Sequence, residues 1–387
     1  MKITIVGAGN AGCLTALHYA FFTGNRSDVE IELIHNPEIS PEKVGQATFP
    51  DEPKLLWDAL DFTFRSKIHT TPKTGILYEG WGRKIDKIFH PFPTGNIGIH
   101  FCPCELQNNI LKSGLFNVVE SDVLDVNNID SDYIFDCRGK PNDYTDYGEL
   151  INPINSVILA KPNWDTSNTL WTRSVATPDG WAFIIPSNKN SPSISGAVGY
   201  LYNDKCTPKE HAVQNLSNMF DVEITNSFNF KNYYAKKPII DNRIFLNGNR
   251  LSFLEPLEAT AVHTYLYWAK ECFDLIFNLE NDGYHVTSIH RDTFFNEAQS
   301  RLQTHLHQIQ DFILWHYAFG SKYDSPFWNY AIDLAKRTID DPYFHDKITK
   351  AANSSWHDVK IKEVIDQKPA FGPWRSSSIK YWIDGVC

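Results

Sequence analysis

Two polar side chains, far apart in the chain, have the surroundings that catalysis needs. Lys73 lies in the segment TTPKTG (70–75), and its amine becomes a nucleophile where burial lowers its pKa. Glu258 lies in EPLEATA (255–261), directly before a run with helical spacing, where a carboxylate can act as a general acid or base. In the first turn of that helix the N–H groups of Thr260 and Ala261 lack intrahelical acceptors, so they can bind a small anion such as a halide. The plainer alternatives are a solvated turn lysine and an acid favoured by the helix dipole.

The N-terminal segment predicts a dinucleotide-binding unit that would position such groups. Residues 1–6 predict a buried strand, GAGNAG (7–12) opens a helix, and residues 29–34 predict a second strand. The three glycines allow a tight turn, the close approach of a pyrophosphate and the packing of helix on strand. Where an acid usually binds the ribose hydroxyls, the second strand ends in His35, so any ribose binding must use another group.

The remaining patterns predict an α/β fold with an added sheet and a helical end. Residues 133–139 predict a further strand of the open sheet. Short alternating runs over about 65–130 and 151–235 predict an inserted sheet above the cofactor, in which 181–186 and 196–202 pair.

Residues 294–319 predict a long amphipathic helix, and we expect His316 to be a satisfied helix histidine rather than a ligand. From residue 340 to the end the pattern loosens, and Trp356, Trp374 and Trp382 are expected among turns. We therefore expect one lobe over 1–290 and a helical substrate-side region over 291–387.

Composition excludes several classes of protein. The 387 residues carry a net charge of −10 without a basic run, which argues against nucleic acid as a partner. No apolar run is long enough to cross a bilayer, and no His, Cys, Asp or Glu spacing indicates a metal. Seven irregularly spaced cysteines and no leader segment predict a cytoplasmic protein. The 14% aromatic content, with 11 Trp, suggests an aromatic-lined pocket.

Several short motifs occur in the same order as in the flavin-dependent tryptophan-type halogenases, and the chain resembles that family over most of its length. The glycine turn resembles the family's FAD turn, and Lys73 falls where the family's catalytic lysine follows a V-G-E-A-T-x-P loop. The other similar segments are VGQATFP (44–50), WAFIIP (181–186), GNRLSFLEPLEATA (248–261), and DFILWHY (311–317) with DSPFW (324–328).

The resemblance implies an FAD-binding domain of the flavin monooxygenase type and a set of site residues. The catalytic residues it implies are Lys73, which relays the halogen, and Glu258, which acts as acid or base. It implies halide binding by Thr260 and Ala261, and separation of flavin from substrate by Trp181, Phe183 and Pro186. The implied cofactor contacts are Gly7, Gly9, Ala11, Gly12, His35, Gly45, Gln46, Ala47 and Gly248.

The implied reaction uses reduced FAD from a separate flavin reductase, O2 and a halide to form hypohalous acid, which halogenates an electron-rich aromatic small molecule. For this relay, the amine of Lys73 and the carboxylate of Glu258 must share one internal chamber. The sequence departs from the family at Gln46, which replaces an acid, at Phe183, which replaces a Trp, and at Ala261, where relatives often have Gly or Ser. The chain is also shorter than typical tryptophan halogenases, so free tryptophan is a poor default substrate.

Two other functions remain open. One is a single-component FAD-dependent aromatic hydroxylase, which needs neither a lysine relay nor a halide site. The other is a non-catalytic flavoprotein that binds a partner. The sequence leaves the substrate, the halide and the oligomeric state undetermined.

Overall fold

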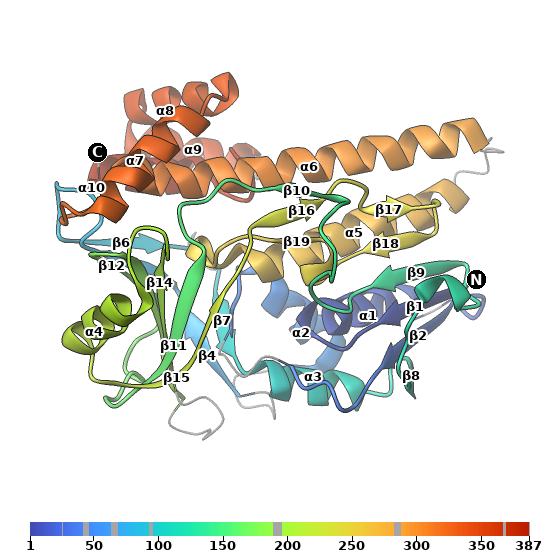
Figure 1. The fold of residues 1–387 in the computed structure, drawn as a ribbon. Helices are drawn as coiled ribbons and strands as arrows, with labels where there is room; N and C mark the ends of the chain where they lie inside the picture. The colour runs from blue at the N-terminus through green and yellow to red at the C-terminus, as the bar shows by residue number, and fades with distance from the viewer. Residues whose placement is uncertain are drawn as a thin grey trace.

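The structure is a computed structural model that describes residues 1–24, 26–41, 46–62, 69–92, 96–188, 196–281, 288–366 and 369–386. Three regions share the chain: a parallel sheet near the N-terminus, a larger mixed sheet, and a group of helices over both (Figure 1).

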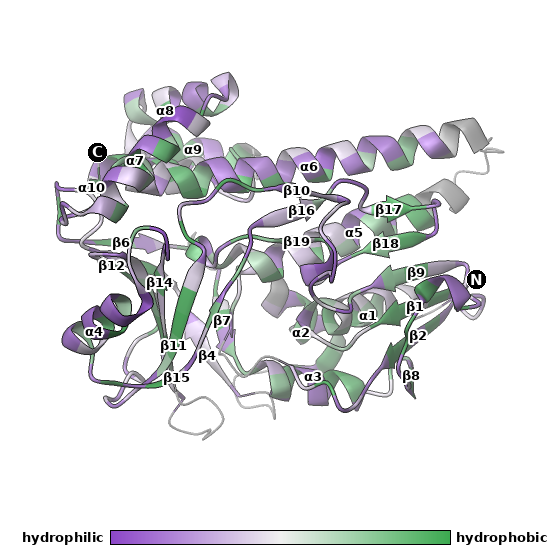
Figure 2. Ribbon diagram, in the orientation of Figure 1, coloured by the Kyte–Doolittle hydropathy of each residue, from purple (hydrophilic) through white to green (hydrophobic). Residues whose placement is uncertain are grey.

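The first region is a six-stranded sheet that confirms the Rossmann-like expectation. Its strand order is β17-β18-β9-β1-β2-β8, and every neighbouring pair is parallel except β17 with β18. The central strands are buried, and Figure 2 shows their largely hydrophobic residues in green. The strands are β1 (Lys2–Val6), β2 (Glu30–His35), β8 (Asn117–Glu120), β9 (Tyr133–Asp136), β17 (Ile239–Ile240) and β18 (Ile244–Leu246).

Helix α1 (Asn10–Thr23) packs on this sheet, and α3 (Pro103–Leu111) and α5 (Thr260–Asn281) pack against α1. The first strand and helix follow the glycine turn as expected. Strand β8 lies inside the range predicted for the inserted sheet, but it pairs with β2 and so extends the parallel sheet.

The second region is a seven-stranded sheet with the order β15-β11-β14-β13-β12-β5-β6. The predicted pairing of 181–186 with 196–202 is confirmed, because Gly180 lies opposite Tyr202 and Ile185 opposite Ala197. The strands are β5 (Gly75–Glu79), β6 (Lys87–Pro91), β11 (Ser156–Pro162), β12 (Thr172–Thr177), β13 (Gly180–Ile185), β14 (Ala197–Tyr202) and β15 (Val222–Asn229), with α4 (Lys209–Met219) against them.

Two small sheets connect the large ones. The first has the order β3-β7-β4 and contains β3 (Gln46–Ala47), β4 (Thr70–Lys73) and β7 (Gly98–Phe101), with α2 (Asp51–Leu60) following β3. The second contains β10 (Tyr147–Glu149), β16 (Tyr233–Ala235) and β19 (Ser252–Phe253).

The third region is helical. The predicted helix 294–319 is α6 (Ser288–Ala318), which crosses the molecule above β10, β16 and β19 (Figure 1). Helices α7 (Pro326–Thr338), α8 (Pro342–Asn353), α9 (Trp356–Asp366) and α10 (Ser376–Val386) gather at one end of it. The predicted division at 290 would fall inside α6, and that division stays a prediction.

The expected helical character of the C-terminal region continues past residue 340, where three helices form. The expectation that Trp356 and Trp382 lie among turns is therefore wrong. Trp356 begins α9 and Trp382 lies within α10, while Trp374 lies between them. A capping side chain marks the start of each of the first two of these helices. Asp341 accepts a hydrogen bond from the Tyr343 N–H at 2.9 Å, and Ser355 accepts one from the Asp358 N–H at 3.2 Å. In the part of the chain that the structure describes, no helix has both the length and the apolar character needed to span a membrane.

Candidate active site

The glycine turn between β1 and α1 has the backbone that the sequence predicts. Gly7 has a φ of +102°, and a Cβ there would lie 2.7 Å from the carbonyl oxygen of Cys137. A Cβ on Gly12 would lie 1.8 Å from the carbonyl oxygen of Gly7. A Cβ on Gly9 would meet nothing within 4 Å. Two glycines therefore close the turn against the protein, and the third faces open space.

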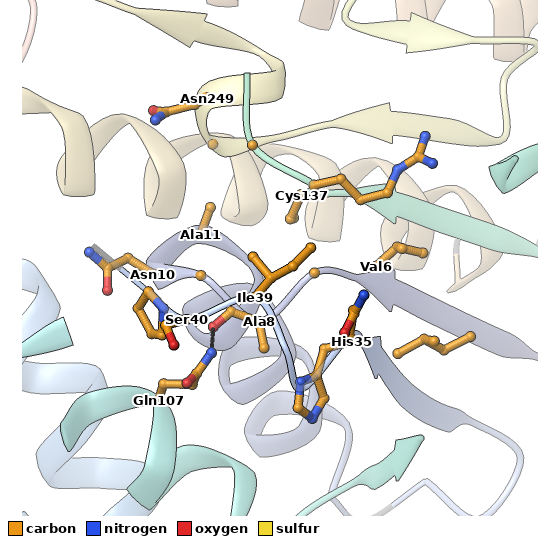
Figure 3. A pocket seen from close by; sticks show the side chains of 18 of the residues that line it. Val6, Ala8, Asn10, Ala11, His35, Ile39, Ser40, Gln107, Cys137 and Asn249 are labelled. Atoms are coloured by element: carbon orange, nitrogen blue, oxygen red, sulfur yellow. Dashed lines mark hydrogen bonds between the residues drawn. The ribbon is translucent and has the colours of Figure 1, made fainter. Parts of the chain in front are cut away.

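That space is a cavity lined by residues from several parts of the chain (Figure 3). Gln107 closes one side, and its amide N–H donates to the carbonyl oxygen of Ala8 at 2.7 Å. Helix α1 has no side-chain cap at its N-terminus, so its first N–H groups remain available to a phosphate. The residues present thus fit a dinucleotide such as FAD.

The predicted cofactor contacts lie in and around this cavity. Those that line it are Gly7, Gly9, Ala11, His35, Gln46 and Gly248. Gly12 lies behind the turn, Ala47 follows Gln46 in β3, and Gly45 lies outside the described residues. Arg138 also lines the cavity, fixed by Asp136 through two hydrogen bonds of 2.9 Å. Sequence reasoning did not select this arginine, which brings a fixed positive charge to the cavity.

Lys73 is the last residue of β4, and its side chain is 0% exposed. Its ammonium nitrogen lies 5.2 Å from the centroid of the Phe92 ring, a cation–π distance. The nearby His100 is also buried, and burial together with the charge of Lys73 holds the pKa of this imidazole well below its usual value. The alternative of a solvated turn lysine therefore does not hold.

Glu258 lies at an irregular junction directly before α5. It has a φ of +69° and Ala259 a φ of +57°, so two successive non-glycine residues adopt left-handed backbone. Such residues cost free energy and persist only where the surroundings hold them. The next two residues, Thr260 and Ala261, begin the helix, where N–H groups lack intrahelical acceptors.

Three donors surround the buried carboxylate of Glu258. The Tyr78 hydroxyl donates to Oε1, and the His316 Nε2 lies 2.9 Å from the same oxygen. The Trp374 indole N–H donates to Oε2 at 3.0 Å. His316 uses its other nitrogen, Nδ1, to donate to the carbonyl oxygen of Phe312 at 2.7 Å. Both ring nitrogens of His316 therefore face oxygen atoms, which fixes the orientation of the imidazole beside Glu258.

Burial alone would raise the pKa of Glu258, but its hydrogen bonds and neighbouring charges reverse that effect. The hydrogen bond and charge of His316, the charge of His90 and the Tyr78 hydrogen bond together lower the pKa of Glu258 to about 2. The carboxylate is therefore ionised at neutral pH and able to accept a proton.

His90 and Phe92 connect the surroundings of Lys73 and Glu258. The Nδ1 of His90 lies 3.9 Å from Glu258 Oε1. Burial lowers the pKa of His90, and the charges of His316 and Lys73 lower it further, against the opposing effect of Glu258. Both His90 and Phe92 line a cavity of about 390 Å³ that also contacts Glu258 and Trp374, and Phe92 covers Lys73. Direct or water-mediated contact between Lys73 and Glu258 stays a prediction.

A second carboxylate, that of Glu255, is also buried. It accepts hydrogen bonds from the Asn152 amide at 2.8 Å, the Trp181 indole at 2.9 Å and the Tyr317 hydroxyl at 2.8 Å, and burial raises its pKa. Trp181 and Phe183 lie in β13, directly before the buried Pro186. The indole N–H of Trp181 is thus used to fix Glu255.

Sequence reasoning missed most of the shell around Glu258. Tyr78, His90 and Trp374 were not selected, and His316 was expected to be a satisfied helix histidine rather than a ligand. Both nitrogens of His316 do have hydrogen-bond partners, but one partner is the Glu258 carboxylate, which the sequence did not indicate. The available signal was the DFILWHY segment, which is the one motif of the family resemblance that received no chemical role.

The fold and the site define a dinucleotide-binding protein of the Rossmann-like class that also buries a lysine and a glutamate outside the lining of the cofactor cavity. A sequence model of the family described as tryptophan halogenase matches residues 2–114 and 141–355. The chain therefore belongs to the tryptophan halogenase family.

Individual relatives are distant in sequence. Tryptophan 7-halogenase RebH of Lentzea aerocolonigenes is 22% identical over 214 residues, which are 51% of this chain and 38% of RebH. Tryptophan 7-halogenase KtzQ of Kutzneria sp. (strain 744) is 26% identical over 168 residues, which are 42% of this chain and 29% of KtzQ. The matched region thus spans less than half the length of these two curated relatives.

Solved structures share the fold over nearly the whole chain. A tryptophan halogenase from Shewanella frigidimarina superposes with a TM-score of 0.78 at 18% identity, covering 100% of this chain and 88% of that protein. The tryptophan 6-halogenase SttH from Streptomyces toxytricini gives a TM-score of 0.74 at 18% identity, with 100% and 90% covered. At such identities these structures establish the fold alone.

Proposed function

We propose that this protein is a flavin-dependent halogenase that acts on an electron-rich aromatic small molecule. The single observation that carries the proposal is the burial of Lys73, whose ammonium lies against Phe92, a residue of the cavity that also contacts the buried Glu258. An exposed lysine could not protect an electrophilic halogen from water. Membership of the tryptophan halogenase family supports halogenation as the reaction class. The roles that we assign to Lys73 and Glu258 rest on their burial and on the residues that contact them.

FAD would be held by the glycine turn and the cavity wall, with its phosphates at the N-terminus of α1. When bound in reduced form, FAD supplies two electrons that, with two from the halide, reduce O2 to water and the oxygen of hypohalous acid. We assign halide binding to the N–H groups of Thr260 and Ala261 at the start of α5.

Lys73 would capture the oxidised halogen. As an ammonium it donates a hydrogen bond to the oxygen of hypohalous acid. As a neutral amine it forms an N–X bond while the O–X bond breaks, and water leaves with the amine proton. The contact with Phe92 and the absence of exposed surface keep bulk water away from either species.

Glu258 would act chiefly as a base. When the arene carbon takes the halogen, its C–H proton must leave, and the low pKa of Glu258 supplies an ionised acceptor. Tyr78, His316 and Trp374 position that carboxylate. Trp181, Phe183 and Pro186 would form the wall between flavin and substrate, with Trp181 fixed by Glu255.

A separate flavin reductase and a cytoplasmic location complete the proposal. The test supplies enzymatically reduced FAD, each halide in turn and a panel of electron-rich arenes, and follows product masses. Halide-dependent mass shifts are the expected result. A hydroxylated product formed with NAD(P)H and without halide would instead identify a hydroxylase. No product with any reductant would leave a non-catalytic flavoprotein.

A further inference from the structure

The cavity beside Glu258 has an aromatic wall and two unneutralised cations. Its volume is about 390 Å³, and its wall includes Phe49, Phe92, Tyr267 and Trp374. Such flat apolar surfaces suit an aromatic ring. Lys270 of α5 and Arg375, just before α10, also line it.

The charge of this cavity is positive although the chain as a whole carries −10. Among the described lining residues, the one carboxylate is that of Glu258, which already accepts hydrogen bonds from Tyr78, His316 and Trp374. Neither Lys270 nor Arg375 forms a salt bridge with an acid in the described parts of the chain. Two positive charges therefore face the cavity without an acidic partner.

The three histidines of the cavity do not change this balance. Burial lowers the pKa of His90, and it lowers the pKa of His263 to about 4 and that of His305 to about 3, with further lowering from Lys270 and His263 respectively. These imidazoles are neutral at neutral pH. They contribute ring surface, as the stacking of His305 on Tyr267 at 4.1 Å between centroids illustrates.

We propose that the arene halogenated by this protein carries a carboxylate, which Lys270 and Arg375 bind while the ring lies near Glu258. This inference rests on the proposed function and adds the substrate class to it. The guanidinium of Arg375 can bind a carboxylate through two parallel hydrogen bonds, and Lys270 adds a point charge. An ammonium group on the substrate would find no unoccupied carboxylate among the described lining residues, which argues against amines.

The spacing along α5 indicates the shape of such a substrate. Lys270 lies about 15 Å along the helix axis from Thr260, and side chains on a helix lean toward its N-terminus. The ammonium of Lys270 therefore lies less than about 15 Å along the axis from the start of α5, within reach of a carboxylate on a short alkyl chain. An arylalkanoate meets this requirement better than benzoate, in which the charge adjoins the ring.

The test measures binding by isothermal titration calorimetry to the full chain loaded with oxidised FAD. The probes are indolepropionate, indolepropanol and indolepropylamine, which differ in charge alone, and the matching hydroxyphenyl series. We expect the propionates to bind about 10-fold more tightly than the propanols, and the propylamines to bind most weakly. Equal binding of propionate and propanol in both series would overturn the inference.

Substitutions of Lys270 and Arg375 test whether these two residues cause the preference for propionate over propanol. Lys270→Gln and Arg375→Gln should each lower the propionate-to-propanol affinity ratio about 10-fold. Lys270→Arg should largely preserve the ratio, because it keeps the charge. Lys336→Gln, at an exposed position of α7, removes the same charge outside the cavity and should leave the ratio unchanged. An unchanged ratio in both Lys270→Gln and Arg375→Gln would overturn the assignment.

Turnover separates this inference from the proposed function. Tight, charge-dependent binding without halogenation under any halide would reject the halogenase proposal and retain the anionic site. Halogenation of propanols and propylamines as efficient as that of propionates would retain the halogenase and reject the substrate class.

Discussion

Trp374 donates its indole N–H to Glu258 Oε2 over 3.0 Å, across 116 positions of the chain. The Phe312 ring of α6 stacks on Trp374 with centroids 3.8 Å apart, and His316 lies against Trp382 of α10 at 4.0 Å. The carboxylate of Glu258, at the junction before α5, thus receives contacts from His316 of α6 and from Trp374, just before α10. Removal of residues 291–387 would leave Glu258 without the contacts of His316 and Trp374.

Glu258→Gln should lower kcat for halogenation by about 10² to 10⁴, because an amide cannot accept the arene proton. The rate is measured under saturating halide with the best arene of the panel. Glu255→Gln is the matched control, because it removes a buried carboxylate that does not line the cavity. Similar losses of kcat in the two variants would show that Glu258 has no special role as a base.

Lys73→Ala should abolish halogenation while reduced FAD is still oxidised by O2 to give hydrogen peroxide. Lys73→Met, which keeps most of the packing against Phe92, should behave in the same way and thereby separate loss of the amine from loss of volume. Peroxide and halogenated product are measured in the same reaction. A wild-type product yield in either variant would eliminate the lysine relay, and Lys336→Met provides the exposed-lysine control.

Local patterns predicted those parts of the fold in which neighbouring residues determine structure. The glycine turn, the pairing of β13 with β14 and the long helix α6 each follow from periodicity or turn chemistry within a short window. Helices α8 and α9 lie in the region expected to be helical but were not identified individually, although Asp341 and Ser355 mark their starts, because each is too short for a strong periodic signal.

The shell of Glu258 could not be predicted in this way, because its members converge only through the tertiary fold. Tyr78 lies 180 positions from Glu258 and His316 lies 58 positions from it. Each of these residue types also packs well in an ordinary core, so nothing in the local sequence marks it as a partner of a carboxylate. Lys73 and Glu258 were selected only because motif order placed them beside recognisable neighbours.

Gly9→Ala and Gly12→Ala should separate cofactor binding from folding. A methyl group on Gly9 meets no protein atom within 4 Å, so thermal stability should change by less than about 0.5 kcal/mol. The same methyl group enters the cofactor cavity and should weaken FAD binding at least about 10-fold, as measured by calorimetry.

Gly12→Ala should instead destabilise the fold by about 3 kcal/mol or more, since its methyl would lie 1.8 Å from a backbone oxygen that cannot move freely. Equal FAD affinity in Gly9→Ala and wild type would show that the turn does not hold the cofactor.

Acid should destabilise the protein through its buried histidines. The pKa of His305 falls from the unfolded value of 6.5 to about 3 because of burial and the charge of His263. A folded pKa below the unfolded one means that the unfolded chain binds the proton first as pH falls. The corresponding stability is fully present above pH 6.5 and is lost as the pH falls from there toward 3, at no more than about 1.4 kcal/mol per pH unit.

His305→Phe keeps a ring against Tyr267 and should flatten the dependence of unfolding free energy on pH across that window. Urea unfolding at several pH values measures the slope, and His211→Phe, an exposed position of α4, serves as the control. If His305→Phe retains the wild-type slope, protonation of His305 does not drive acid unfolding, and the loss of stability then comes from other buried groups such as His18 and His263.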